Sequence, residues 1–279
     1  MLNFLRGNPL RLYIGIFLLL VVATFGLVLP FFAPGDPLEG YASPRNQPPS
    51  WAHALGTTSL GQDIFWLLTL AVRNSLILGV TVAFLSTLIG VFLGLTAGYV
   101  GGWVDRGLSA LMDALICIPT LPILILLAAL MGGQLSLPFC GIALVVFNWP
   151  FPGRQVRAVA LSMREREFVN VAWFSGESRS RILTRHIFPY IAGWSVANFI
   201  NTVLVAIATE SALAVIGLSS AQQATIGTMI YWALEYQALL GGRYVWIGSP
   251  VVAIVGLFIG LFLLSSGLAM RSAERRMSV

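Results

Sequence analysis

The sequence contains no lysine, and all sixteen of its basic residues are arginine. A Walker-type P-loop uses the lysine of a Gly-Lys-Ser/Thr sequence to hold nucleotide phosphates. The chain therefore has no such nucleotide site, and any ATP that the protein uses must be bound by a partner.

Charged residues are scarce: they make up 10% of the chain, whereas 57% of residues are hydrophobic and the mean hydropathy is +0.86. A soluble domain is typically about 25% charged and about 45–50% apolar. Several apolar runs exceed the roughly 18 residues that indicate a transmembrane helix. These features predict an all-α, polytopic membrane protein rather than an unusually apolar soluble one. The net charge of +5 is explained by loop arginines on the cytoplasmic side, so we expect no nucleic-acid partner.

Cysteine and histidine are also rare, with two of each. Cys117 and Cys140 lie in apolar segments, and their spacing indicates neither a disulfide framework nor a metal site. His53 and His186 stand alone and are interpreted as structural residues, because a metal site needs several ligands. No His/Asp/Glu cluster has a catalytic spacing. We therefore expect no metal, no cofactor bound by this chain and no catalytic residue.

Six apolar stretches are predicted to cross the membrane: about 12–32, 74–97, 107–131, 138–160, 191–217 and 249–270. Pro119 and Pro122 should kink the third stretch, and Pro150 with Pro152 should break the fourth. No small-residue cleavage site directly follows the first stretch, so we expect it to be retained as a helix.

The distribution of arginine predicts the orientation of the chain. With the N-terminus in the cytoplasm, only Arg45, Arg73 and Arg243 fall outside, and the other thirteen arginines fall inside. We therefore expect both termini to be cytoplasmic. The predicted organisation is an N-terminal span with an outer segment (1–72), a core of five spans (73–270) with a cytosolic loop (161–190), and a cytosolic tail (271–279).

The cytosolic loop has the pattern of two short helices. The first is expected from Glu167 to Ser175 and should stop at Gly176, since glycine favours a helix C-terminus. A second is expected from Ser178 through His186, limited by Pro189. One face of the first helix is formed by residues three and four apart, which are Phe168, Val171, Ala172 and Ser175.

An apolar helix face in water must be covered. A groove in a partner can cover it, as can the cytosolic ends of the protein's own spans or a membrane surface. The residues alone leave these three alternatives open.

Polar and small residues within the spans are further candidates. Glu210 is expected either to line a translocation path or to hydrogen-bond a neighbouring helix, and Asp113 is interpreted as an interhelical contact. Asn148 and Trp149, at the predicted break of the fourth span, are the other candidates for the path. Small residues also recur at every fourth position of the second span, where they permit close packing with another span of this chain or with a second subunit: Gly90, Gly94 and Gly98.

The loop sequence "EFVNVAWFSG", followed by "RILTRHIFP", resembles the EAA loop of permease subunits in binding-protein-dependent ABC importers. More closely, it resembles the dipeptide/oligopeptide/nickel group. Asn170 and Val171 depart from the usual Glu and Ala. Four other stretches resemble the group in the same order, namely "LGTTSLGQDIF", "AGYVGGWVDR", "NWPFPGRQVR" and "ATESALAVIGL".

The resemblance implies a type I ABC importer permease: a non-catalytic subunit that forms half of a translocation path in a bacterial or archaeal cytoplasmic membrane. The implied partners are a second homologous permease, two ATPases that bind ATP and Mg²⁺, an extracytoplasmic solute-binding protein and membrane lipid. In this family the loop is the coupling helix, which contacts the ATPase. The implied contact residues are Glu167, Phe168, Val171, Ala172, Trp173, Gly176 and Arg181.

The substrates of this group are peptides, nickel complexes and oligosaccharides, of which peptides are the commonest. The alternative interpretation, from another class of transporter, is an ion-coupled secondary transporter. That class predicts inverted repeats and paired intramembrane charges. The sequence shows no obvious repeat, and only two charged residues, Asp113 and Glu210, are candidates for a deep position in the membrane.

Overall fold

The computed structural model describes residues 9–178, 181–220 and 222–277, with side chains described as far as Leu268. Arg6 and Arg179, counted above as cytoplasmic, lie outside the described residues. The described chain is helical, without a named strand. Its elements are α1 (Pro9–Ala23), η2 (Thr24–Val28), η3 (Leu29–Phe32), α2 (Ile64–Val100), α3 (Gly102–Cys117), α4 (Thr120–Leu130), α5 (Leu137–Asn148), α6 (Pro150–Arg164), α7 (Glu167–Phe174), η4 (Ile182–Ile187), α9 (Phe188–Val215), α10 (Ile226–Glu235) and α11 (Tyr244–Met277).

Four of the described helical segments are long and apolar enough to cross a membrane: Leu10–Phe32, Ile64–Val100, Ile182–Val215 and Tyr244–Leu268. The pair α3 and α4 makes a fifth if it is counted as one span, bent by 77° at the break before Thr120. This bend lies where Pro119 was predicted to kink the chain.

The fourth expected span, 138–160, corresponds to α5 and α6 and does not meet the same criterion. Helix α5 ends at Asn148, and α6 begins at Pro150, as the prolines predicted. These helices have 12 and 15 residues, so neither reaches the 18 residues needed to count as a span by itself. The structure thus gives four or five spans by length and composition, where six were expected.

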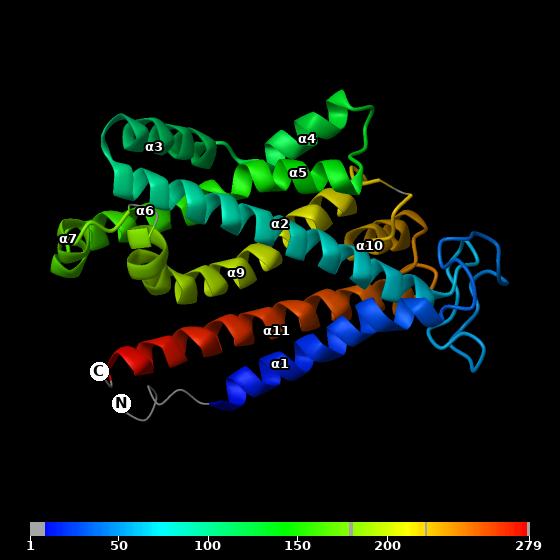
Figure 1. Ribbon diagram of the computed structural model, residues 1–279. Coiled ribbons are helices and arrows are strands. Elements are labelled where there is room, and N and C mark those ends of the chain that lie inside the picture. The colour runs from blue at the N-terminus through cyan, green and yellow to red at the C-terminus, as the bar shows by residue number, and fades with distance from the viewer. Residues whose placement is uncertain (1–8, 179–180, 221, 278–279) are drawn as a thin grey trace.

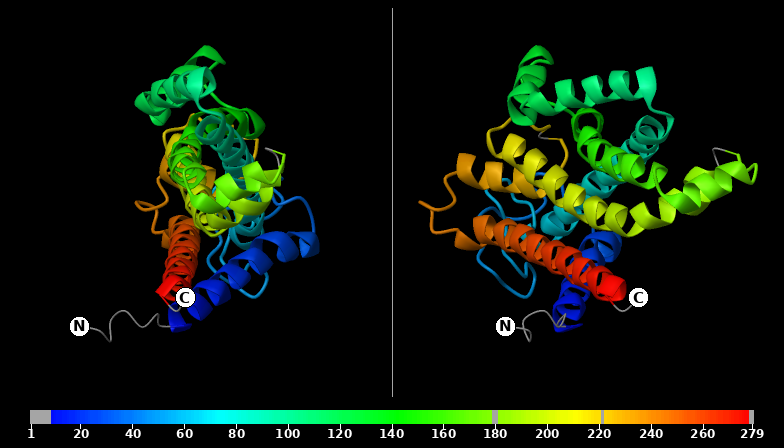
Figure 2. Two further views of the ribbon diagram at one scale, coloured as in Figure 1. Left: turned by 60° about the vertical axis from the view of Figure 1, so that its left-hand side comes forward. Right: turned by 90° about the vertical axis from the view of Figure 1, so that its left-hand side faces the viewer.

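Helix α2 runs through the middle of the molecule, with α1 and α11 packed side by side on one flank and α3, α4 and α5 on the other (Figure 1). The beginning of α1, the end of α11 and α7 all lie at one end, which we call the inner end. Residues 33–63 lie at the opposite, outer end (Figures 1 and 2). The structure therefore places the predicted cytosolic loop and both ends of the described chain on one side.

The glycine face of α2 packs against α6. A Cβ atom at Gly90 would stand 2.7 Å from the carbonyl oxygen of Trp149, and one at Gly98 would stand 2.6 Å from that of Arg157. A Cβ at Gly94 would overlap the carbonyl oxygen of Gly153. The small residues thus permit backbone contact between two helices of the same chain, which settles the partner that the sequence left open.

Helix α2 begins at Ile64 rather than near residue 74. Asp63 caps it by accepting hydrogen bonds from the backbone N–H groups of Phe65 (2.9 Å) and Trp66 (3.3 Å). His53 holds this cap through a 2.8 Å contact between its Nδ1 and the Asp63 carboxylate, which agrees with the structural role expected for it. The residues up to 72, assigned from the sequence to the outer segment, therefore include the first turns of a spanning helix.

A second correction concerns Pro189, which does not separate two helices. Residues Ile182–Ile187 form a π-helical turn that runs directly into α9. A π turn changes the hydrogen-bond register, so the chain accommodates a proline, which lacks an N–H donor, without ending the helix.

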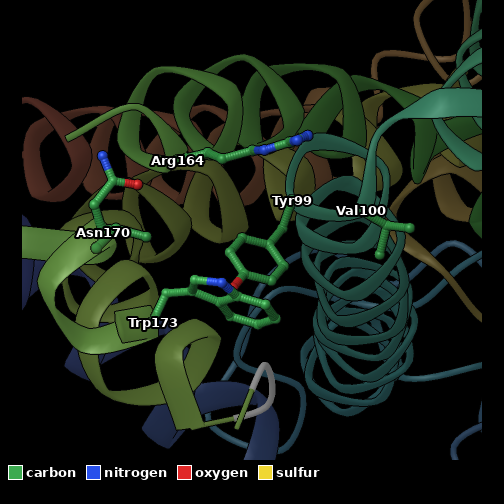
Figure 3. A pocket seen from close by; sticks show the side chains of 6 residues that line it. Tyr99, Val100, Arg164, Asn170 and Trp173 are labelled. Atoms are coloured by element: carbon green, nitrogen blue, oxygen red, sulfur yellow. The ribbon is translucent and has the colours of Figure 1, made fainter. Parts of the chain in front are cut away.

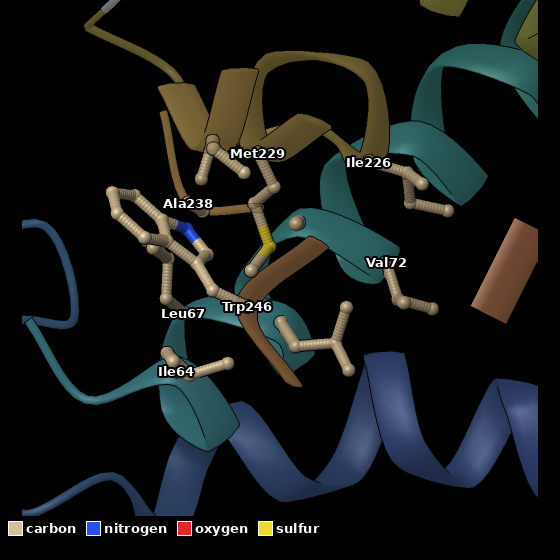
Figure 4. Packing of buried hydrophobic residues seen from close by; sticks show 11 residues of the cluster. Ile64, Leu67, Val72, Ile226, Met229, Ala238 and Trp246 are labelled. Carbon is tan, nitrogen blue, oxygen red and sulfur yellow. The ribbon is translucent and has the colours of Figure 1, made fainter. Parts of the chain in front are cut away.

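The outer end has its own apolar core, in which Trp246 is buried against Met229 and Leu67 (Figure 4). Arg243 attaches the outer segment to this core. Its Nη1 donates to Asn46 Oδ1 (2.6 Å) and also contacts Ser59, and its Nη2 donates to the carbonyl of Tyr236 (2.6 Å). The outer segment, although irregular, is therefore fixed to the connection between α10 and α11.

Candidate functional site

Helix α7 is a short, separate helix at the inner end of the molecule. It follows α6 directly and ends at Gly176, whose φ of +80° is a left-handed conformation that favours glycine. The N–H of Gly176 donates to the carbonyl of Trp173 (3.0 Å), and the N–H of Glu177 donates to that of Ala172 (3.1 Å). These two bonds satisfy the last carbonyl groups of α7. Both the helix and its stop at Gly176 were predicted from the sequence.

The inward face of α7 packs on its own chain. Val169 and Ala172 are 3% and 6% exposed and belong to a cluster of buried apolar residues from four other elements, which are Val91 of α2, Val156 of α6, Ile182 and Ile187 of η4, and Ile191 of α9. Of the three alternatives left open by the sequence, packing against the protein's own spans therefore applies to this face of α7.

The outward face of α7 is apolar and exposed. Phe174 is 86% exposed and Val171 is 64% exposed, and about half of the Trp173 surface is accessible. Phe168 is less exposed, because its ring stacks on Tyr190 with centroids 5.9 Å apart. Large apolar residues gathered on one face mark an interaction surface.

The structure divides the predicted contact residues. Glu167, Phe168, Val171, Trp173, Gly176 and Arg181 are exposed, whereas Ala172 faces its own chain. Phe174 also belongs to the exposed face, but the sequence did not predict it. The predicted face was counted at the third, fourth and seventh residues after Phe168, and those positions do not include 174. The apolar run of α7 continues around the helix, so periodicity alone gives no clear division between its faces.

The loop after α7 is held to η4. His186 Nε2 lies 3.1 Å from a carboxylate oxygen of Glu177, and the His186 ring lies 6.5 Å from that of Phe168. His186 is thus a structural residue of the loop, as predicted. Together with the inward apolar packing, this contact fixes α7 to the start of α9.

Two ion pairs connect α3 and α6 near the same end. Asp105 accepts two hydrogen bonds from Arg157, one of them 2.8 Å long from Nη2 to Oδ2. Asp113 pairs with Arg154 at 3.1 Å, which confirms its prediction as an interhelical contact. The two parallel hydrogen bonds between Arg157 and Asp105 fix the relative orientation of the two side chains in addition to pairing their charges. The two sequence stretches "AGYVGGWVDR" and "NWPFPGRQVR" therefore meet through Asp105 and Arg157.

The three candidate path residues are all buried within the chain. Asn148 is 8% exposed and donates from Nδ2 to the carbonyl of Leu144 (2.8 Å), and Trp149 is 7% exposed. Glu210 is fully buried. A role in lining the path remains a prediction for each of them.

Glu210 joins α9 to the segment that leads into α10. One of its oxygens accepts hydrogen bonds from the hydroxyls of Ser219 (3.1 Å) and Thr225 (2.9 Å). Thr225 in turn caps α10 by accepting from the N–H of Thr228 at 3.1 Å. Ser75 of α2 accepts from the N–H of Ile226 at 3.1 Å. The hydrogen-bonding alternative for Glu210 is thus observed: Glu210 fixes the start of α10 to α9, and Ser75 fixes it to α2.

Within the described part of the chain, no group of three His, Cys, Asp or Glu side chains is arranged to hold a metal ion. The inner end presents an apolar helix face with charged groups around it.

Replacing Glu210 tests this network. Glu210→Gln retains an oxygen acceptor, so we expect an unfolding temperature close to that of the wild type. Glu210→Leu leaves two buried hydroxyls without their acceptor, at a cost of about 1–3 kcal/mol for each unsatisfied group. We expect a lower unfolding temperature in detergent for the Leu variant alone. Equal stability of the Leu and Gln variants would contradict a structural role for the carboxyl group.

Comparison with known proteins identifies the family to which the chain belongs. The model of the family described as "Binding-protein-dependent transport system inner membrane component" matches residues 90–279. The oligopeptide transport system permease protein OppC of Mycobacterium tuberculosis (strain H37Rv) is 32% identical to this chain over 231 residues, 82% of this chain and 78% of the relative. The dipeptide transport system permease protein DppC of Bacillus subtilis (strain 168) is 34% identical over 214 residues, 77% of this chain and 66% of the relative.

The fold also resembles a solved transporter. The likeness to a chain of the MetNI methionine ABC transporter in an inward facing conformation has a TM-score of 0.57 at 17% sequence identity, covering 74% of this chain and 96% of that chain. The similarity confirms the predicted all-α fold of a type I importer permease. With the family match, it also favours the ABC importer over the ion-coupled secondary transporter. The chain belongs to the family of inner membrane components of binding-protein-dependent transport systems, which are the permease subunits of ABC importers.

Proposed function

We propose that α7 is the coupling helix of this permease and that its outward face docks in a groove of an ATPase subunit. The observation that carries the proposal is the exposed apolar face of Val171, Trp173 and Phe174 at the inner end of the molecule. Apolar side chains in water are unfavourable by about 25 cal/mol for each Å² that a partner would bury. An amphipathic helix in a groove is a common solution.

The packing of α7 explains how docking would act on the membrane spans. Its inward residues Val169 and Ala172 contact a cluster to which α2, α6, η4 and α9 all contribute. A displacement of α7 would therefore be passed to several spanning helices at once, because packed interiors transmit strain rather than absorbing it. ATP and Mg²⁺ would be bound by the ATPase subunits, and closure of two ATPases would move α7.

The complete importer proposed here contains a second homologous permease, two ATPases and an extracytoplasmic solute-binding protein. This chain would form one half of the translocation path in a bacterial or archaeal cytoplasmic membrane, with the inner end in the cytosol. The excess of arginine on that side supports this orientation.

We infer further that the transported solute is a peptide, because the relatives reported above are described as oligopeptide and dipeptide permeases. Cells that express the full importer should accumulate a labelled dipeptide or oligopeptide in an ATP-dependent manner. Unlabelled peptide should compete, whereas a nickel complex should not. Accumulation of nickel without peptide uptake would contradict the substrate class while leaving the permease function intact.

Changes on the outward face of α7 test the docking. Phe174→Asp and Val171→Asp place a charge where an apolar groove would enclose it, and an unpaired buried charge costs several kcal/mol. We expect both variants to insert normally but to lose most of the co-purifying ATPase and most of the solute uptake. Phe174→Leu is the matched control: it keeps the face apolar and should keep both. Normal ATPase binding by both Asp variants would mean that this face is not the docking surface.

A further inference from the structure

A pocket opens beside α7, at the point where three elements meet (Figure 3). Its volume is about 230 Å³, and it is lined by Tyr99 and Val100 from the end of α2, Arg164 from the end of α6, and Val169, Asn170 and Trp173 from α7. A space of this size accommodates one side chain rather than a peptide. Trp173 belongs both to this pocket and to the exposed face of α7, so a partner docked on that face would also cover the pocket.

Arg164 differs from the other arginines of α6. Arg154 and Arg157 pair with Asp113 and Asp105, respectively. By contrast, the guanidinium group of Arg164 makes no hydrogen bond or ion pair with the residues that the structure describes. The pocket wall therefore carries a guanidinium group whose donors are not used by the described part of the chain.

The turn between α2 and α3 makes room for this guanidinium group. A Cβ atom at Gly101 would stand 2.6 Å from Nη1 of Arg164, so a larger residue there would displace the end of the arginine side chain. The φ of Gly101 is +72°, which also favours glycine. The side chain of Arg164 thus ends beside this turn, and Figure 3 shows it extending above Tyr99 toward the end of α2 that carries Val100.

We propose that this pocket receives the carboxylate of an Asp or Glu side chain of the docked ATPase, with Arg164 as its principal partner. This inference rests on the proposed docking of α7. A guanidinium group presents a planar fork of donors that matches a carboxylate. Tyr99 and Asn170 line the same pocket and add polar groups to its wall.

The position of the pocket favours an ATPase residue over a lipid phosphate group. The pocket shares Trp173 with the exposed apolar face, on which Val171 and Phe174 lie. The same docked surface would therefore supply the carboxylate and exclude water from the pair. An ion pair removed from water in this way is stronger than an exposed one.

The test uses the full importer assembled with its own ATPase, and it measures the dissociation constant of the ATPase from the membrane complex as a function of salt. We expect Arg164→Gln to weaken binding about 10-fold or more, the usual range for a hydrogen bond to a charged group, and to reduce the salt dependence. Arg164→Lys should recover part of the affinity, since lysine keeps the charge but not the fork. Arg185→Gln, which removes an exposed arginine outside the pocket, is the control and should bind as the wild type does.

Charge reversal identifies the partner residue. Arg164→Glu should abolish binding, and one Asp→Lys or Glu→Lys change in the ATPase groove should restore it. Failure of every such ATPase variant to restore binding would overturn the proposal. So would a loss of binding to phosphatidylglycerol vesicles with unchanged ATPase affinity, which would assign the pocket to lipid. A fall in the unfolding temperature of the isolated permease with unchanged ATPase affinity would assign Arg164 a structural role and would also overturn it.

The outcomes separate this inference from the proposed function. If Phe174→Asp abolishes ATPase binding while every Arg164 variant binds normally, the coupling role stands and the carboxylate site is wrong. If neither change affects binding, the docking of α7 is itself wrong.

Discussion

The close packing of α6 on the glycine face of α2 determines the geometry of the inner end. Cβ atoms at Gly90, Gly94 and Gly98 would collide with the backbone of α6, so the two helices are held at a distance that larger residues do not permit. Helix α6 ends at Arg164, and α7 begins at Glu167. The position of α7, the proposed coupling helix, is therefore set by backbone contact inside the spanning part of the molecule, and not by a flexible connection.

Helix α7 has one face that is buried against its own chain and one that is exposed. Val169 and Ala172 bind it to α2, α6 and the beginning of α9, whereas Val171 and Phe174 leave an apolar surface exposed. A helix bound on one face and free on the other can pass a force from a partner to the spans. The outer end, by contrast, is fixed by Arg243 and by the hydrogen bonds of Glu210. Polar contacts are present near the inner end as well, where Asp105 pairs with Arg157 and Glu177 contacts His186, but the outward face of α7 remains exposed.

Much of this architecture follows from local sequence rules, and the failures have physical reasons. The helix over α7, its stop at Gly176 and the break at Pro150 were predicted because caps, positive φ and proline act within a few residues. Such rules do not predict which distant segments of the chain come into contact. The glycine spacing predicted close packing but not that α6 is the partner. The burial of Ala172 depends on η4, and the exposure of Phe174 depends on the absence of a covering segment. The sequence predicts that a helix ends before Pro189, because a π turn leaves no evident signal in the sequence.

Position-specific disulfide crosslinking in the assembled importer tests the central claim most directly. With Cys117→Ser and Cys140→Ala as the background, a cysteine at position 174 should crosslink to a cysteine introduced in the ATPase groove. A cysteine at position 169, on the buried face of the same helix, should not. Crosslinking at 174 alone would show that the outward face of α7 lies in the groove. Absence of a crosslink at 174 in a complex that hydrolyses ATP and transports solute would contradict the account.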